Sequence, residues 1–416
     1  MILNFGCGTE NQTVQVPDEN LLGVLTENPV PVGLTGQAEV RRALAAPIGS
    51  APLRQIVRPG EKIAIITSDI TRPMPTAVVL PPLLEELDAA GVSRADITLV
   101  FALGSHRPHT EQERRHLAGE EAWHSIRCVD SDPGDCLLLG TTAAGTPVEI
   151  TRVVAQADRR ICLGNIEYHY FAGYSGGAKA LMPGVSTRAA IQANHAMMVR
   201  PECRAGALED NPLRQDIEEA GRLCGIDFIV NVVLDPHKQI LRAVAGDAIA
   251  AHRAGCAFLD SVYSCPIREK ADIVLVSQGG APKDLNLYQT QKALDNAKHA
   301  VRDGGIIILI GSCREGFGES TFESWLRQAR TSGELIERIG LEFRLGGHKA
   351  AAIAMVLERA QIYLVSQMEP EFARTAFMTP KATAQQALED AFAQLGPGAT
   401  VWAMPCGGST LPKIVI

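Results

Sequence analysis

The sequence lacks the patterns that mark several large classes of protein. Its ten cysteines are scattered without a CxxC pair, so neither a zinc knuckle nor a disulfide framework is indicated, and most are expected to be buried reduced thiols. No apolar run is long enough for a transmembrane helix, and the N-terminus lacks the basic start and apolar run of a signal peptide. These absences favour a cytoplasmic location.

Basic clusters and low-complexity tracts are also missing. The formal net charge is -8, and no run of lysine and arginine offsets it, which argues against a protein that binds nucleic acid through its phosphates. The composition is that of an ordinary globular protein, with 46% hydrophobic and 21% charged residues. At 416 residues the chain is longer than one hydrophobic core usually spans, so two domains are expected.

Short β-branched runs alternate with helical patterns, which is typical of parallel α/β layers. We therefore expect two α/β domains with mainly parallel sheets, over residues 1–268 and 269–404. Pro266 and the restart of the strand–helix rhythm mark the break between them. The predicted strands lie at residues 62–67, 97–103, 160–165 and 228–234 in the first domain, and at 271–280, 304–313, 362–368 and 400–405 in the second.

Polar residues follow three successive strands of the first domain. Asp69 and Arg72 come after the first strand, His106 after the second, and His169 after the third. In open α/β sheets, ligands bind beyond the carboxyl ends of the strands. If the three strands are parallel neighbours, these side chains share one cleft.

The segment after the third strand, residues 165–195, is the most informative part of the chain. It reads NIEYHYFAGYSGGAKALMPGVSTRAAIQANH, and its glycine-rich turn lets a ligand approach the backbone N–H groups closely. Lys179 follows the turn directly. Ser186 is predicted to cap a helix that carries His195. Two imidazoles and an amine are therefore expected around one glycine-lined pocket.

Each of these residues also has an ordinary alternative. A lone histidine after a strand is more often structural than catalytic, but His106 and His169 as a pair suit acid and base chemistry on two faces of a substrate. Lys179 could be an ordinary solvated lysine, but its position directly after GGA favours contact with a phosphate or a covalent link. The turn lacks the GxxxxGK[ST] spacing of a P-loop. Gln289 and Lys292 share a helix face that, by itself, is equally typical of an exposed amphipathic helix.

Taken together, the residues resemble the lactate racemase family, the nickel-pincer-nucleotide enzymes that interconvert enantiomers of 2-hydroxy acids. The resemblance covers most of the chain. It rests on DITRP at 69–73, GSHRPH at 104–109, HYFAGYSGGAKALMPG at 169–184, NH at 194–195 and YQTQK at 288–292.

That resemblance implies a cofactor and a set of roles. Lys179 would be the covalent anchor of a nickel-pincer nucleotide (pyridinium-3,5-bisthiocarboxylic acid mononucleotide nickel), and His195 would be the protein ligand to nickel. His106 and His169 would be the acid and base. The remaining implied residues are Asp69, Tyr174, Ser175, Gly176, Gly177 and Pro183 for the cofactor, and Arg72, Tyr288, Gln289 and Lys292 for the substrate.

The resemblance also implies how the chain is organised and what it meets. The active site would lie in the cleft between the two domains, and residues 405–416 would return to the first domain. Expected partners are a small 2-hydroxy acid and the proteins that make and load the cofactor, with no nucleic acid or membrane. A homo-oligomer is left open. The alternatives are a metal-dependent hydrolase that uses the same histidines and a non-catalytic carrier of a nucleotide cofactor.

Overall fold

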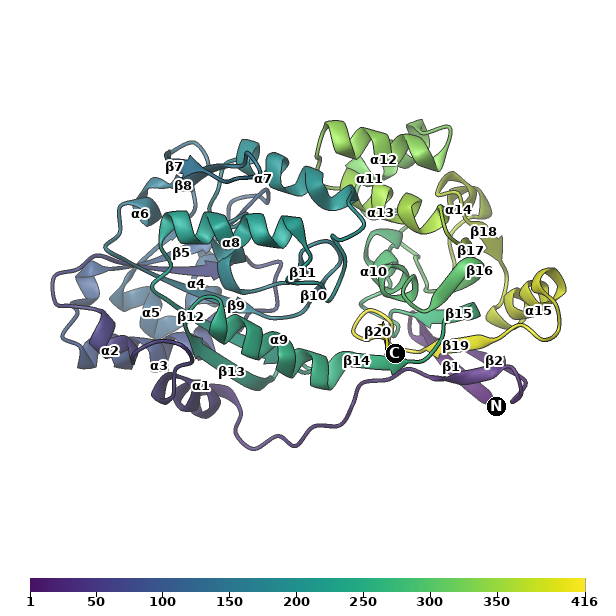
Figure 1. Cartoon of the computed structure of the whole chain (residues 1–416), viewed down its shortest axis with the longest axis horizontal. Coiled ribbons are helices and arrows are strands. Elements are labelled where there is room, and N and C mark those ends of the chain that lie inside the picture. The colour runs from purple at the N-terminus through teal and green to yellow at the C-terminus, as the bar shows by residue number, and fades with distance from the viewer. Residues whose placement is uncertain (416) are drawn as a thin grey trace. The chain divides into compact units, whose positions relative to one another are not determined.

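The computed structural model describes residues 1–415, and the chain divides into two compact units. The central unit comprises residues 30–261, and the terminal unit comprises residues 1–29 together with those from 262 onward. Each unit contains a six-stranded sheet flanked by helices (Figure 1). The expectation of two α/β bodies with mainly parallel sheets is therefore confirmed.

The central unit is built from short strands and helices in alternation. Its strands are β4 Ile63–Ser68, β5 Ile97–Ala102, β6 Arg127–Asp130, β7 Cys136–Thr141, β8 Pro147–Thr151, β9 Arg159–Asn165, β10 Tyr168–His169, β11 Gly173–Tyr174, β12 Phe228–Leu234 and β13 Ile240–Gly246. Its α-helices are α1 Gly36–Ala45, α2 Leu53–Ile56, α3 Thr76–Ala89, α4 Glu111–Ala118, α5 Glu120–Ser125, α6 Arg152–Ala155, α7 Arg188–His195, α8 Pro212–Cys224 and α9 Ala250–Tyr263. Three 3-10 helices complete it: η1 Arg94–Asp96, η2 Gly177–Ala180 and η3 Ala196–Val199.

The main sheet of the central unit has the order β13-β12-β9-β4-β5-β6. Five of its strands are parallel, and β13 pairs antiparallel with β12. The chain runs outward from β4 through β5 to β6 and then returns to the other side of β4 as β9. The point where the strand order reverses therefore lies between β4 and β9, which is where ligands bind in folds of this kind.

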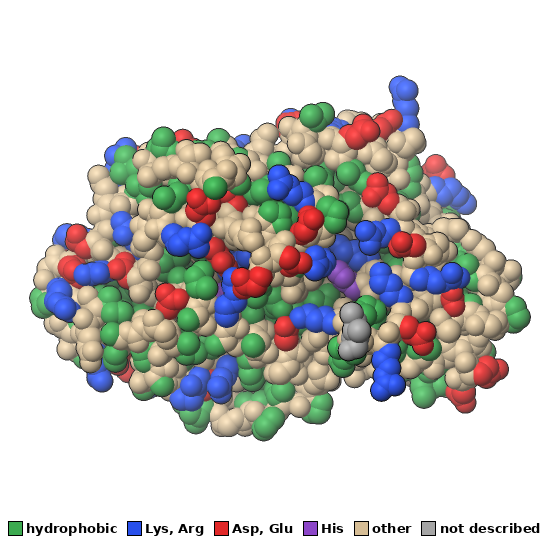
Figure 2. Space-filling view, in the orientation of Figure 1, with side chains coloured by type: hydrophobic (Ala, Val, Ile, Leu, Met, Phe, Trp, Pro, Cys, Tyr) green, Lys and Arg blue, Asp and Glu red, His purple; other side chains and the backbone are tan. Residues whose placement is uncertain are grey.

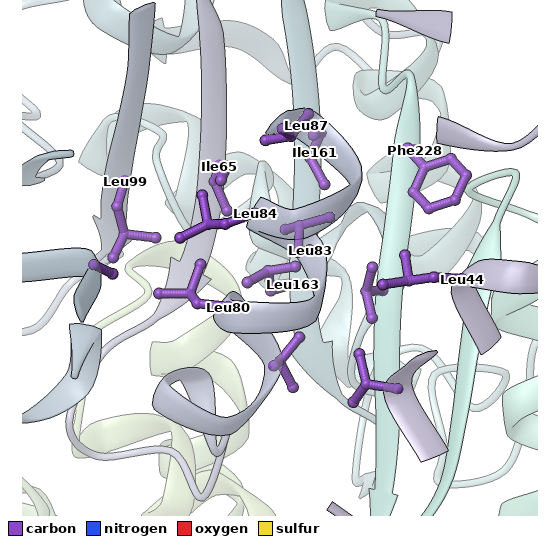
Figure 3. Close-up of a cluster of buried hydrophobic side chains, with 14 of the residues drawn as sticks. Leu44, Ile65, Leu80, Leu83, Leu84, Leu87, Leu99, Ile161, Leu163 and Phe228 are labelled. Atoms are coloured by element: carbon purple, nitrogen blue, oxygen red, sulfur yellow. The ribbon is translucent and has the colours of Figure 1, made fainter. Parts of the chain in front are cut away.

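Helix α3 covers one face of this sheet because its apolar residues recur at helical spacing. Leu80, Leu83, Leu84 and Leu87 are fully buried and belong to the same hydrophobic cluster as side chains of β4, β5 and β9 (Figure 3). The strands themselves are apolar on both faces, as expected for parallel strands covered by helices. This core fixes the three strands whose ends carry the polar residues.

The terminal unit repeats the plan with different loops. Its strands are β1 Ile2–Cys7, β2 Glu10–Gln15, β3 Leu21–Val24, β14 Ser264–Ile267, β15 Ala271–Ser277, β16 Val301–Ile310, β17 Gln361–Val365, β18 Thr379–Lys381, β19 Val401–Met404 and β20 Leu411–Ile414. Its helices are α10 Leu287–Ala297, α11 Ser320–Gln328, α12 Ser332–Leu341, α13 Gly347–Leu357, α14 Pro370–Thr375 and α15 Ala384–Leu395. The six-stranded sheet has the order β18-β17-β16-β15-β19-β3, and all of its pairings are parallel.

The unit boundaries differ from the expected ones at both ends of the chain. The first 29 residues belong to the terminal unit, because β3 pairs with β19 and the β1–β2 hairpin buries Phe5, Val14 and Val16 against the core of the β15–β16 sheet. Residues 405–415 also stay in the terminal unit, where β20 pairs with β14, so the expected return to the first domain is wrong. Both pairings join segments far apart in sequence, and no local pattern announces them.

The surface and the cysteines agree with the composition. On the face in Figure 2, basic and acidic side chains are interspersed. All ten cysteines are free thiols, and seven of them are buried, as expected. Among residues 1–415, no helix combines the length and the apolar character that a membrane span requires.

Candidate active site

Three loops of the central unit meet at one edge of its sheet. Strand β4 pairs in parallel with β5 on one side and with β9 on the other, so the condition for a shared edge is met. The loop after β5 is tied to the segment that follows Lys179, because the N–H of Gly104 donates to the carbonyl of Gly184 (2.8 Å). The loops after β4, β5 and β9 therefore lie at one edge of the sheet, as the sequence predicted, and their role as the site stays a prediction.

Asp69 and His106 form a hydrogen-bonded pair that joins the first two loops. The Oδ2 atom of Asp69 contacts Nδ1 of His106, and Oδ1 accepts from the hydroxyl of Thr71 at 2.8 Å. Asp69 is buried and His106 is partly exposed. The carboxylate therefore holds one ring nitrogen of His106 and orients the imidazole.

Asp69 is arranged to remain ionised. Burial opposes ionisation and is the largest single influence on its pKa, but the hydrogen bonds from His106 and Thr71 and the nearby charge of Arg72 outweigh it. The pKa of Asp69 is therefore lowered. A charged carboxylate accepts a hydrogen bond from the imidazole beside it, which fixes the orientation of the ring.

The other polar residues of the GSHRPH loop have structural partners. Nε2 of His109 accepts from the N–H of Ile70 (3.0 Å), and its Nδ1 lies 2.6 Å from Asp130. Arg107 forms two hydrogen bonds with Glu113 on helix α4. His109 thus fastens the loop after β4 to the strand end of β6, which helps keep Asp69 and His106 together.

Phe171 is the point where the segment after β9 brings its functional groups together. Its ring centroid lies 4.5 Å from that of His169 and 4.9 Å from that of His195, edge-on in both cases. The amine of Lys179 lies 5.8 Å from the same centroid. Two imidazoles and an amine therefore surround one buried aromatic ring, as the sequence predicted for the group but not for Phe171.

The environment of Lys179 favours a neutral amine. Burial is the main reason that its pKa falls well below the usual value, and the positive charges of Arg72 and Arg214 lower it further, while Glu167 acts in the opposite direction. An unprotonated amine is a nucleophile. This is the state that a covalent link through Lys179 requires.

His195 ends helix α7 and has a defined ring orientation. Its Nδ1 lies 2.9 Å from Oδ1 of Asn194, whose amide nitrogen donates to Asp216 (2.7 Å) and to the carbonyl of Leu213 (3.2 Å). Because the amide nitrogen is used in this way, Oδ1 is the atom that faces His195, and it accepts from Nδ1–H. The lone pair of the ring is then on Nε2, as a metal-ligating imidazole requires.

Helix α7 begins one residue later than expected. Thr187 is its N-cap, and the hydroxyl of Thr187 accepts from the N–H of Ala190 (3.2 Å). Ser186, the predicted cap, instead donates its hydroxyl to the carbonyl of Leu181 (2.8 Å). Both residues can cap a helix, so only the backbone path of the preceding turn decides between them.

The glycine-rich turn is packed against the interior of its own unit. The N–H of Gly177, which we expected to face a ligand, donates to Oδ1 of Asn231 (2.7 Å). A Cβ on Gly176 would lie 2.7 Å from that same oxygen, and one on Gly177 would lie 2.7 Å from Nη2 of Arg214. These two glycines therefore make room for buried side chains, and the expectation that Gly177 offers its N–H to a ligand is wrong.

Other residues predicted for the cofactor also have partners inside the protein. The hydroxyl of Tyr174 donates to Asp260, and burial is the main reason that the pKa of Tyr174 is raised. Ser175 donates its hydroxyl to the carbonyl of Asn165 (2.7 Å) and accepts from the N–H of Glu167 (2.9 Å). Pro183 is partly buried in the turn between η2 and α7. The contacts show how Tyr174 and Ser175 hold the turn, and their role toward a cofactor stays a prediction.

The predicted substrate residues are divided between the units. Arg72, in the central unit, is exposed and acts electrostatically on both Asp69 and Lys179. Tyr288, Gln289 and Lys292 lie on α10 of the terminal unit, where the backbone N–H of Gln289 is capped by Asn286 and the side chain of Lys292 is exposed. The amine of Lys349 donates to the carbonyl of Tyr288 (2.6 Å) and lies 3.8 Å from its ring centroid.

Several buried polar residues on α8 and its neighbours were not predicted from the sequence. Arg214, Asp216, Asn231 and His252 are all buried and contact the turn or the neighbour of His195. In the sequence, helix α8 reads as an ordinary amphipathic helix whose charged residues face solvent. Asn194, directly before His195, was the one local signal. Among residues 1–415, no group of three or more His, Cys, Asp and Glu side chains has the arrangement of a metal site.

Comparison with known proteins assigns the chain to a family. Residues 7–206 match the model of the lactate racemase N-terminal domain, and residues 267–411 match that of the lactate racemase C-terminal domain. The chain belongs to the lactate racemase family. It is 32% identical to the lactate racemase of Thermoanaerobacterium thermosaccharolyticum, over 98% of each chain. It is 33% identical to that of Lactiplantibacillus plantarum, over 96% of this chain and 97% of the relative.

Solved structures agree with membership in the lactate racemase family. The lactate racemase apoprotein from Thermoanaerobacterium thermosaccharolyticum superposes with a TM-score of 0.89 at 31% identity, covering 99% of this chain and all of the other. A Thermotoga maritima protein shares the fold, with a TM-score of 0.64 at 16% identity over 92% of this chain. The family resemblance carried by the motifs is therefore confirmed.

Proposed function

We propose that this protein is an isomerase that interconverts the enantiomers of a 2-hydroxy acid, lactate or a related compound. The observation that carries the proposal is the grouping of His169, His195 and Lys179 around Phe171 in a member of the lactate racemase family. This grouping combines an imidazole that can exchange protons, an amine that can form a covalent link and an imidazole poised as a ligand. His106, which Asp69 holds on the loop after β5, would be the second group that exchanges protons.

The residues fit a covalently attached nickel-pincer nucleotide. Lys179 would hold it, because burial lowers the pKa of Lys179 and so favours the neutral amine that covalent attachment requires. His195 would bind nickel through Nε2, since the hydrogen bond to Asn194 keeps the proton on Nδ1. When bound, the cofactor would supply a group that reversibly accepts a hydride from the substrate.

The two histidines have complementary tasks in this proposal. The Cα proton of a 2-hydroxy acid is only weakly acidic, so proton abstraction at carbon by histidine alone faces a high barrier. Removal of the hydroxyl proton is within the reach of an imidazole. One histidine takes this proton as the hydroxyl carbon becomes planar, and the other returns a proton when the opposite enantiomer forms.

His106 and His169 differ in how they are held. The carboxylate of Asp69, whose pKa is lowered, contacts Nδ1 of His106 and orients its ring. Nδ1 of His169 accepts from the N–H of Ala172 (3.2 Å) and its ring packs on Phe171. We propose that Arg72 binds the substrate carboxylate, and that Tyr288, Gln289 and Lys292 also contribute to substrate binding.

The proposal is tested by loading the purified protein with the cofactor and following a single enantiomer of lactate by chiral chromatography. Equilibration of the two enantiomers is expected, and intact-mass and peptide analysis should place the adduct on Lys179. The matched control is Lys62→Arg, at an exposed lysine paired with Asp96. Active protein with unmodified Lys179 would contradict the attachment site.

Two other results would overturn the proposed function. Hydrolysis of esters or amides with bound zinc and no racemisation would identify a metal-dependent hydrolase instead. Attachment of the cofactor to Lys179 without conversion of any enantiopure 2-hydroxy acid in a panel would identify a carrier. A panel that includes larger hydroxy acids also determines which substrate is preferred.

A further inference from the structure

The carbonyl oxygens of the glycine-rich turn point toward a buried cation. Nη1 of Arg214 lies 3.2 Å from the carbonyl oxygen of Tyr174 and 3.4 Å from that of Gly176. Nε2 of His252 lies 2.8 Å from the carbonyl oxygen between them, that of Ser175. Three successive carbonyls, immediately before the segment that carries Lys179, are therefore bound from inside the protein.

Arg214 and His252 form one unit with a fixed polarity. Nε2 of His252 donates to Ser175, so Nδ1 is its acceptor, and this atom lies 3.0 Å from Nη2 of Arg214. Burial is the main reason that the pKa of His252 lies well below its usual value, and the charge of Arg214 lowers it further. A neutral His252 accepts a hydrogen bond from the guanidinium of Arg214 at Nδ1 and donates one from Nε2 to the carbonyl of Ser175.

The charge of Arg214 is balanced away from the turn. Its Nε donates to Glu218 (2.7 Å), one turn further along α8, and the same carboxylate accepts two hydrogen bonds from Arg253 (2.7 and 3.0 Å). Arg214 is completely buried and Glu218 nearly so. A fully buried, paired arginine is costly to place in a protein, so its contacts with the turn need an explanation beyond general stability.

The double glycine supplies an independent observation. Gly177 has a φ of +59°, and a Cβ there would lie 2.7 Å from Nη2 of Arg214 and 3.0 Å from the ring of His252. The turn therefore has glycine at this position because the guanidinium and the imidazole fill the space beneath it. A residue larger than glycine at this position would collide with the guanidinium of Arg214.

We propose that Arg214 is a positioning residue that, together with His252, holds the carbonyls of the glycine-rich turn and thereby sets the position of Lys179. This inference rests on the proposed function only for the role of Lys179 as the attachment site. The contacts of Arg214 and His252 with the turn do not depend on a cofactor. The positive charge of Arg214 also contributes to the lowered pKa of Lys179, after burial and Arg72. Arg214 thus acts on the amine through both the backbone and its charge.

The test compares Arg214→Met with Arg253→Met in cofactor-free full-length protein. Both variants remove one of the two arginines on Glu218 and leave the other, but only Arg214 contacts the turn. Arg214→Lys, which keeps the charge and loses the forked donor geometry, is the third variant. Denaturant unfolding of each variant shows how much of any effect is global.

The first readout is amide hydrogen exchange of peptides that cover residues 173–179. In Arg214→Met this exchange should be about tenfold faster than in the wild type, the factor expected when one hydrogen bond of typical net strength is lost locally. Arg214→Lys should lie between the two. Arg253→Met should not differ from the wild type beyond its change in global stability.

The second readout is the pH midpoint at which Lys179 reacts with an amine-directed reagent, followed by peptide mass spectrometry. Loss of the nearby cation makes the ammonium form easier to keep, so the midpoint should move to higher pH in Arg214→Met and stay near the wild-type value in the other two variants. If Arg214 were merely structural, Arg214→Met would not raise this midpoint while Arg214→Lys left it unchanged.

Unchanged exchange of the turn and an unchanged midpoint in Arg214→Met would overturn the inference. The same holds if Arg253→Met produces equal changes. Neither measurement uses the cofactor or a substrate. A failure of the proposed racemase function would appear instead as absent conversion by loaded wild-type protein, and the two failures are therefore distinguishable.

Discussion

The two units reverse their strand order in the same way but carry different groups after the first strand of the sheet. In each sheet the strand order reverses beside the first strand of the series, between β4 and β9 in the central unit and between β15 and β19 in the terminal unit. An aspartate follows each first strand. Asp69 contacts Thr71 and a histidine that can exchange protons, whereas Asp284 accepts from the backbone N–H groups of Gly8 (2.7 Å) and Ser312 (2.9 Å).

The difference shows that the same edge of a parallel sheet can hold different groups, and that the loop partners of an aspartate decide what it does there. A carboxylate on backbone N–H groups holds loops together, while a carboxylate on an imidazole orients a group that can react. The glycines show less contrast. Gly177 in the central unit and Gly408 in the terminal unit both make room for a buried side chain, Arg214 and Gln278 respectively.

The largest effect should come from the histidines of the central unit. His106→Ala and His169→Ala should each reduce racemisation by about 10²- to 10⁴-fold, the usual contribution of a general acid or base. His299→Gln, in the terminal unit, should retain activity. Initial rates with each enantiomer of the substrate measure the effect. Nearly full turnover in both alanine variants would remove the functional contrast between the two units.

Alanine at two glycines separates strain from crowding. Gly177 and Gly316 have similar φ angles of +59° and +68°, but a Cβ on Gly316 would meet nothing within 4 Å. Gly316→Ala should therefore lose only the backbone cost, about 1–2 kcal/mol of unfolding free energy. Gly177→Ala should lose more and should also attach cofactor poorly. Denaturant unfolding and intact-mass analysis provide the two measurements, and equal losses would argue against crowding by Arg214.

Replacement of the two aspartates should separate stability from activity. Asp284→Ala leaves the buried N–H of Ser312 and the partly buried N–H of Gly8 without their acceptor. Loss of the buried hydrogen bond should cost about 1–3 kcal/mol of unfolding free energy, and loss of the partly buried one should cost less. The pH dependence of racemisation per folded molecule should not change. Asp69→Asn should alter that pH dependence, because the charge beside His106 is lost. If Asp284→Ala shifted the pH profile as Asp69→Asn does, the proposed division of roles would be wrong.

The smallest effect concerns the cost of keeping Lys179 neutral. Its pKa is lowered in the folded state, so the unfolded chain binds the extra proton and stability rises with pH up to the ordinary lysine pKa of about 10.4. Lys179→Met should remove this cost and make the apoprotein more stable near pH 7. The gain in stability should disappear once the pH exceeds the ordinary lysine pKa of about 10.4. Urea unfolding at a series of pH values measures it. Lys298→Met is the contrasting variant, because it removes the ion pair of a lysine with the buried Asp295.

Local sequence patterns were enough for four strands of each six-stranded sheet and for the helix that carries Gln289 and Lys292. Apolar β-branched runs of strand length have few other uses, and the carboxyl ends of parallel strands share an edge. The pattern was also enough to group His169, Lys179 and His195. It failed at the start of α7, because Ser186 and Thr187 offer the same capping chemistry and differ only in backbone position.

The sequence by itself determined the class of fold, the family and the residue types brought to the site. Only the tertiary structure decided that residues 1–29 join the later part of the chain, because strand pairing between distant segments leaves no local trace. It also decided what the glycines are for. A glycine in a turn is compatible with a ligand outside or a side chain inside, and Arg214, 37 residues after Gly177, takes the space beneath it.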